Sequence, residues 1–141
     1  MGEGAMSALA TVASGDMRRA ITLLQSAARF NQNVLTAEVL YEAAGVVPGA
    51  EIADLVAVCA KSTFSDVERK VKSMISDSYP LGQVLSQVQD YLVASKDVED
   101  DRKARICVKF AQVDKRIADG ANEALQLLDA VGFVHQTLHQ R

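Results

Sequence analysis

Hydrophobic residues recur every three or four positions along most of the chain, the spacing that places them on one face of an α-helix. No alternating run rich in β-branched residues exceeds four positions, so no sheet is expected. The sequence therefore predicts an all-α protein. The expected helices cover residues 17–29, 37–44, 51–61, about 66–78, 80 to at least 92, about 97–119 and 122–139, with 7–13 as the last turns of an earlier helix.

Several polar residues stand where the start of a helix needs a capping group. Asp16 and Thr36 each precede a predicted helix, and their side chains can accept a free amide of its first turn. Ser65 and Glu68 have the S-x-x-E spacing of a capping box, and Phe64 precedes them as the expected hydrophobic staple. These residues predict helix starts close to 17, 37 and 66.

The Val-Val-Pro-Gly segment at 46–49 is the clearest break in the helical pattern. Gly45 can take the left-handed conformation that ends a helix, and Pro48 cannot continue one. We therefore expect a partial first domain at 7–47 and a second domain, a five-helix bundle, at 48–141. Residues 1–6 show no pattern and could be a cloning remnant. Later in the chain, Pro80 is expected to be the first residue of its helix.

The last predicted helix, 122–139, is apolar around more than half of its circumference. A helix of this kind buries more than one side, either in the core or against another chain. We therefore expect part of it to form an oligomer interface. The candidate interface residues are Leu125, Leu128, Val131, Phe133 and Leu138.

Composition narrows the class of protein. The chain has 141 residues, of which 49% are hydrophobic and 23% charged, which is ordinary for a globular protein with a real core. Its net charge of −3 disfavours binding to nucleic acid by this chain alone. No membrane span or signal peptide is expected. The two cysteines, Cys59 and Cys107, are too few for a disulfide framework, so a reducing compartment is expected. Both lie on or beside apolar stripes, which predicts buried, inert thiols.

No motif of a self-contained active site is present. The P-loop, dinucleotide-binding, zinc-protease and nucleophile-elbow patterns are all missing, so a small helical enzyme is disfavoured. His135 and His139 lie one helical turn apart and could chelate a metal. Without a third ligand nearby in sequence, solvent-facing histidines are the favoured interpretation, and no metal site is predicted. The acidic run at 99–101 is interpreted as a solvated helix start.

The start of the 17–29 helix combines Gly15, Met17 and two arginines, Arg18 and Arg19. Arginines at the positive end of a helix dipole are mildly disfavoured, at a cost below about 1 kcal/mol each. The two arginines can therefore be interpreted as ordinary surface residues. The functional interpretation is a phosphate site, because a helix start offers free amides and a guanidinium binds phosphate strongly.

Residues 14–27, S-G-D-M-R-R-A-I-T-L-L-Q-S-A, closely resemble the sensor 2 helix of replication factor C small subunits, which belong to the AAA+ sliding-clamp loaders. The resemblance continues through G-V-V-P at 45–48, K-A-R-I-C at 103–107 and A-D-G-A-N-E-A-L-Q-L-L at 118–128. It covers nearly everything from Ser7 onward and is strongest to the fourth-subunit type. The stretch at 31–35 and Asn122 depart from the family pattern.

This resemblance implies the C-terminal part of a longer nuclear DNA replication protein, whose preceding ATPase domain binds ATP with Mg²⁺. Arg18 matches the sensor 2 arginine that reaches the γ-phosphate of ATP, with Met17 and Gly15 close to the nucleotide. Arg19 would have a lesser role, since it points roughly 100° away. The region 7–47 would be part of the lid domain and 48–141 the collar domain, which forms a ring with other subunits.

The family's sliding clamp and primer-template DNA would be bound through the preceding region. The isolated chain is expected to hold no cofactor and to hydrolyse no ATP, and it could associate with itself. A different class of function stays open, namely a free-standing helical adaptor that binds partner helices and never meets a nucleotide.

Overall fold

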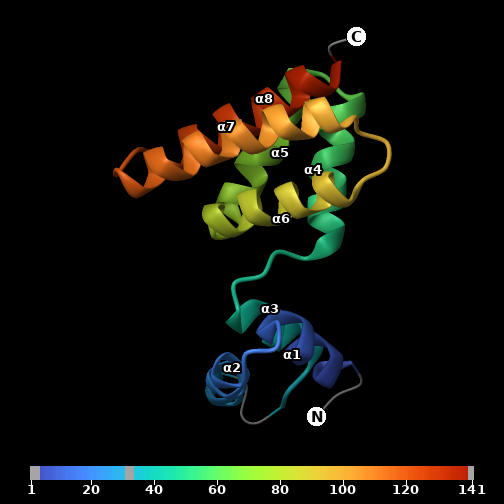
Figure 1. Cartoon of the computed structure of the whole chain (residues 1–141). Coiled ribbons are helices and arrows are strands. Elements are labelled where there is room, and N and C mark those ends of the chain that lie inside the picture. Colours follow the sequence, from blue (N-terminus) through green and yellow to red (C-terminus); the bar gives the residue numbers. More distant parts are fainter. Residues whose placement is uncertain (1–3, 31–33, 140–141) are drawn as a thin grey trace. The chain divides into compact units, whose positions relative to one another are not determined.

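The computed structural model describes residues 4–30 and 34–139. This part of the chain holds eight helices and no strand, so the all-α prediction is confirmed. It forms two compact units, unit 1 (Met1–Pro48) and unit 2 (Gly49–Arg141), and the division falls one residue after the expected boundary (Figure 1). Within the described ranges, no helix is both long and apolar enough to span a membrane.

Unit 1 consists of α1 (Ala5–Ala13), α2 (Met17–Phe30) and α3 (Ala37–Ala43), which contact one another pairwise. Its core is small and built mostly from alanines, which lets the helices approach closely. Ala5 is fully buried in this core, so the fold includes at least this residue of the 1–6 segment. The buried cluster contains Ala5, Ala8, Leu9, Ala27 and Leu40.

The predicted caps of unit 1 are confirmed. Oδ1 of Asp16 accepts hydrogen bonds from the backbone amides of Arg18 (2.8 Å) and Arg19 (3.2 Å). Oγ1 of Thr36 accepts from the Val39 amide at 3.4 Å. Gly45 has a φ of 66°, the left-handed conformation expected after α3. The departure from the family pattern at 31–35 lies partly outside the described residues.

The three-to-four spacing predicts an apolar stripe on α2 that is only partly buried in the structure; it consists of Met17, Ala20, Ile21, Leu24, Ala27 and Ala28. Ala27 is fully buried, and Ala20 and Leu24 pack against the core. Met17 and Ile21, by contrast, are 71% and 54% exposed. The stripe is therefore wider than the face that α1 and α3 cover, and its first turn stays accessible in unit 1.

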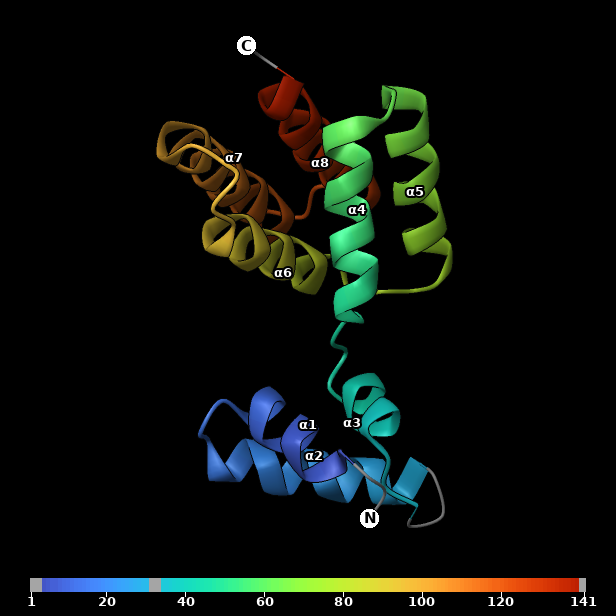
Figure 2. The same ribbon diagram turned by 90° about the vertical axis from the view of Figure 1, so that its right-hand side faces the viewer.

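Unit 2 is a bundle of the five helices α4 (Gly49–Lys61), α5 (Phe64–Ser76), α6 (Leu81–Ala94), α7 (Asp100–Ala118) and α8 (Glu123–His139). Helices α4 and α5 lie side by side, as do α6 and α7 (Figure 2). Helix α8 contacts all four of the others, which makes it the central element of the bundle.

The core of unit 2 follows the predicted stripes closely. The three-to-four spacing predicts Ile75 of α5 and Ile117 of α7 to face inward as well, but both are only half-buried. The stripes that it predicts on α4 and α6 are buried at every residue, namely Ile52, Leu55, Val56 and Cys59 on α4 and Leu81, Val84, Leu85, Val88 and Leu92 on α6. Helix α8 contributes a complete buried face to this core. Its buried residues are Leu127, Ala130, Val131, Val134 and Thr137.

The start of α5 differs from the prediction. The capping residue is Thr63 rather than Ser65, and its partner is Asp66 rather than Glu68. The Asp66 carboxylate accepts hydrogen bonds from the Thr63 hydroxyl (2.7 Å) and amide (3.3 Å). These bonds, the hydroxyl first, hold the pKa of Asp66 below its usual value. Phe64 is consequently the first residue of α5 instead of a staple ahead of it.

The remaining helix ends of unit 2 need smaller corrections. Pro80 is the N-cap of α6 and not its first residue. Glu99 precedes α7, which thus begins within the expected acidic run. Gly120 closes the turn after α7 with a φ of 92°. Asn122 caps α8, because its Oδ1 accepts a hydrogen bond from the Leu125 amide at 3.0 Å.

Truncation of Leu127 tests the central place of α8. Leu127 has no exposed surface, so Leu127→Ala leaves a cavity and should lower the free energy of unfolding by about 2–5 kcal/mol, measured by urea denaturation. Leu125→Ala, on the same helix at a position that is 64% exposed, is the matched control and should change it by no more than about 0.5 kcal/mol. Equal effects of the two variants would contradict this arrangement of α8.

Candidate functional site

The first candidate site is the positively charged turn at the start of α2. The Asp16 carboxylate already occupies the backbone amides of Arg18 and Arg19. The expectation that this helix start offers free amides to a phosphate is therefore wrong for those two groups. The turn can still bind an anion through the guanidinium groups of Arg18 and Arg19, because both residues are exposed.

The residues expected beside Arg18 are accessible as well. Met17 is 71% exposed. Gly15 has a φ of 83°, a conformation that favours glycine, and open space lies where a side chain would begin. Within unit 1, the described residues provide no ion pair to Arg18 or Arg19. The structure thus brings Gly15, Met17 and Arg18 together on one exposed turn.

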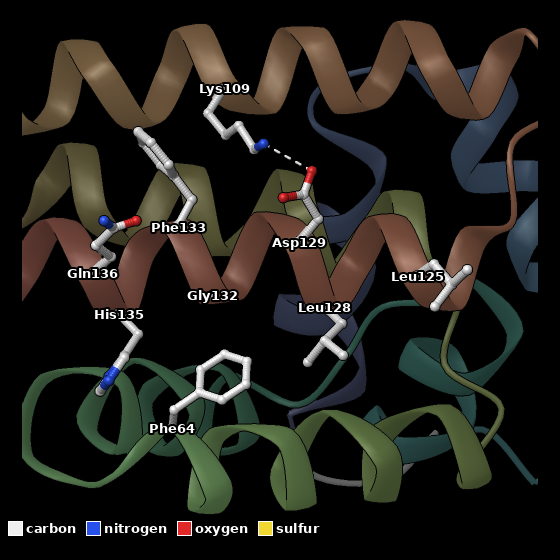
Figure 3. A pocket seen from close by; sticks show the side chains of 9 residues that line it. All are labelled: Phe64, Lys109, Leu125, Leu128, Asp129, Gly132, Phe133, His135 and Gln136. Carbon is white, nitrogen blue, oxygen red and sulfur yellow. Dashed lines mark ion pairs between the residues drawn. The ribbon is translucent and has the colours of Figure 1, made fainter.

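The second candidate site is the outward side of α8, which is flanked by α5 and α7 (Figure 3). It forms an open hollow of about 690 Å³, called the α8 surface below. Gly132 lies at its centre, and the Phe64 ring approaches so closely that a Cβ at Gly132 would lie 3.2 Å from Phe64 Cε2. The α8 surface is lined by Phe64, Lys109, Leu125, Leu128, Asp129, Gly132, Phe133, His135 and Gln136.

One edge of the α8 surface carries charge. Lys109 Nζ of α7 lies 2.8 Å from the Asp129 carboxylate of α8, and Arg116 Nη1 lies 3.2 Å from the same group. Lys109 also lies 5.6 Å from the centre of the Phe133 ring, close enough for a cation–π interaction. Two cations thus share one carboxylate beside the apolar floor of the α8 surface.

The predicted interface residues divide into three groups. Leu125 is 64% exposed, and Leu128 and Phe133 are half-buried members of the α8 surface. Leu138 is half-buried but does not line the hollow. Val131 is 1% exposed, so its prediction as an interface residue is wrong, because it faces the core of unit 2 itself.

Sequence reasoning missed Phe64 and Lys109 as parts of this surface. Phe64 is 49% exposed, although the predicted staple would have packed it against its own helix. The Thr63-x-x-Asp66 spacing was the signal that could have placed Phe64 inside α5 and facing α8. The local sequence gave no indication that Lys109 belongs to this surface, because its partner Asp129 lies on another helix.

The cysteines and histidines form no catalytic group. Cys59 is 1% exposed, and burial raises the pKa of its thiol to about 12, which confirms an inert thiol. Cys107 is only half-buried. His139 is exposed as expected, but His135 is half-buried, with Nδ1 2.9 Å from the Cys59 carbonyl oxygen. Among the residues that the structure describes, no three or more potential metal ligands cluster.

Comparison with known protein families shows to which family this chain belongs. The sequence profile of the "Replication factor C C-terminal domain" matches residues 47–132, more than half of the chain. The chain belongs to the replication factor C family. The matched region begins at the linker and covers unit 2 as far as Gly132 in α8.

Curated relatives extend the similarity to nearly the whole chain. Replication factor C subunit 2 of Oryza sativa subsp. japonica is 42% identical over 125 residues, which are 89% of this chain and 37% of the relative. Replication factor C subunit 4 of Homo sapiens is 38% identical over 133 residues, 94% of this chain and 36% of the relative. Subunit 2 of Schizosaccharomyces pombe is 37% identical, over 95% of this chain and 40% of the relative. The chain thus spans less than half the length of these relatives.

Proposed function

We propose that this chain is the C-terminal part of a replication factor C small subunit and serves in the ATP-dependent loading of a sliding clamp onto primed DNA. The observation that carries this assignment is the overlap between the family's C-terminal domain, at 47–132, and the helical bundle of unit 2. In this proposal unit 2 is a collar that joins the subunit to its neighbours. Unit 1 is the end of the lid domain.

The α8 surface supports a role in assembly. Leu125 on the outward side of α8 and Phe64 at the start of α5 are both exposed apolar side chains, while the other side of α8 is already buried. Covering such a surface with a neighbouring subunit would gain about 25 cal/mol for each Å² of apolar area removed from water. The neighbours would be other replication factor C subunits.

The turn at Arg18 supports a role in sensing ATP. Its guanidinium is accessible while its backbone amide is occupied, so the side chain alone would contact the γ-phosphate of ATP. A charge-assisted contact of this kind stabilises negative charge that develops during phosphoryl transfer. In this proposal, Met17 and Gly15 adjoin the nucleotide, and the preceding part of the subunit holds the Mg²⁺, the clamp and the DNA. The proposed location is the nucleus.

Substitution of Arg18 tests the nucleotide role. In the full-length subunit assembled with its partners, Arg18→Ala should weaken ATP binding at this subunit's site roughly ten- to hundredfold, the value of one hydrogen bond to a charged group. Clamp-stimulated ATP turnover should fall with it. Arg19→Ala removes the same charge one residue along the helix and is the matched control. Unchanged ATP binding and turnover in Arg18→Ala would favour a helical adaptor without a nucleotide role.

Substitution of Leu125 tests the assembly role. Because Leu125 is exposed, Leu125→Glu should leave unit 2 folded but place a charge in the covered interface, weakening association with the other subunits at least about tenfold. Val93→Glu alters a residue of α6 that is 51% exposed and serves as the control. Association is measured by native mass spectrometry over a concentration series. Equal association of the two variants would place the interface elsewhere.

A further inference from the structure

The last two turns of α8 carry the only two histidines of the chain, His135 and His139. They lie four residues apart and therefore on the same side of the helix. Their ring centres are 4.3 Å apart, and the ring planes meet at 48°. The two imidazoles are thus already gathered at one place.

Hydrogen bonds fix which nitrogen of each ring carries a proton. Nδ1 of His135 lies 2.9 Å from the Cys59 carbonyl oxygen, and Nδ1 of His139 lies 2.9 Å from the His135 carbonyl oxygen. A carbonyl oxygen can only accept a hydrogen bond, so Nδ1 is the donor in both rings. In each neutral imidazole, the lone pair is then on Nε2. Metal-binding histidines commonly have this arrangement, with one ring nitrogen donating to a carbonyl and the other free to bind.

The His135 ring is held in place before any ligand arrives. It is half-buried, it is bonded to the last turn of α4, and its centre lies 6.2 Å from that of the Phe64 ring. His139, on the exposed side, can adjust to it by small side-chain rotations. The C-terminal end of a helix also carries partial negative charge, which favours a bound cation.

We propose that His135 and His139 form a two-imidazole chelate for a late first-row divalent cation such as Zn²⁺, bound through both Nε2 atoms. Zn–N bonds of about 2.0–2.1 Å require the two Nε2 atoms to lie roughly 3 Å apart, and the ring centres are already only 4.3 Å apart. Imidazole suits Zn²⁺, Ni²⁺ and Cu²⁺, but not Mg²⁺.

The chelate leaves coordination positions for water. Among the residues that the structure describes, no third histidine, cysteine or carboxylate joins the pair. Two protein ligands bind more weakly than the four of a structural zinc site, so the cation is exchangeable. Affinity should nevertheless exceed that of a single imidazole, because the second ligand binds at a high effective concentration.

Calorimetric titration of the 141-residue chain with Zn²⁺ tests the chelate. We expect one Zn²⁺ per chain and no heat with Mg²⁺. His139→Asn and His135→Asn each remove one Nε2 ligand and should both weaken Zn²⁺ binding at least about tenfold. Asparagine at 135 keeps a side-chain amide that can donate to the Cys59 carbonyl, and far-ultraviolet circular dichroism verifies that the helices remain.

A spacing variant separates chelation from binding by independent imidazoles. Gln136→His combined with His139→Asn keeps two histidines but places the second roughly 100° around the helix from His135. This double variant should bind as weakly as His139→Asn alone. Wild-type affinity in the spacing variant, or an affinity within twofold of wild type in folded His139→Asn, would overturn the chelate. Absence of Zn²⁺ binding to the wild-type chain would overturn it as well.

Discussion

Burial of one face of α8 against four other helices is the interaction on which unit 2 depends. Leu127, Val131 and Val134 of this face are each at most 1% exposed, and each contributes about 1.5–3 kcal/mol by leaving water. Taken together, the other four helices, α4 to α7, contact α8 more extensively than they contact one another. The orientation of α8 therefore decides which of its side chains stay accessible for contacts outside the core of unit 2.

The outward side of α8 follows from that constraint. Because the buried face of α8 is centred on Leu127, Ala130 and Val134, the rotation of 100° per residue places Leu125, Leu128 and Gly132 on the opposite side. The lack of a side chain at Gly132 lets the Phe64 ring of α5 approach, and the Lys109–Asp129 pair marks the edge at α7. One helix thereby contributes both to the core of unit 2 and to a surface of mixed apolar and charged character.

The sequence predicted the fold well and the sites only partly, for identifiable reasons. The stripes of α4 and α6 are single apolar faces, so periodicity alone identified their buried residues. Periodicity cannot distinguish two apolar faces on one helix, which explains why Val131 was assigned to the wrong side and why Met17 and Ile21 of α2 are exposed. The contact between His135 and the Cys59 carbonyl joins residues 76 positions apart and depends on tertiary packing that no local pattern encodes. Arg18 was singled out by family resemblance, because its local pattern also suits an ordinary surface residue.

The most direct measurement is hydroxyl-radical footprinting of the full-length subunit, free and assembled with other replication factor C subunits. If unit 2 is a collar joined through the outward side of α8, oxidation of Leu125 and Phe64 should fall severalfold on assembly, while oxidation of Tyr91 on α6 should change little. Unchanged oxidation of Leu125 and Phe64 in a complete assembly would contradict the account.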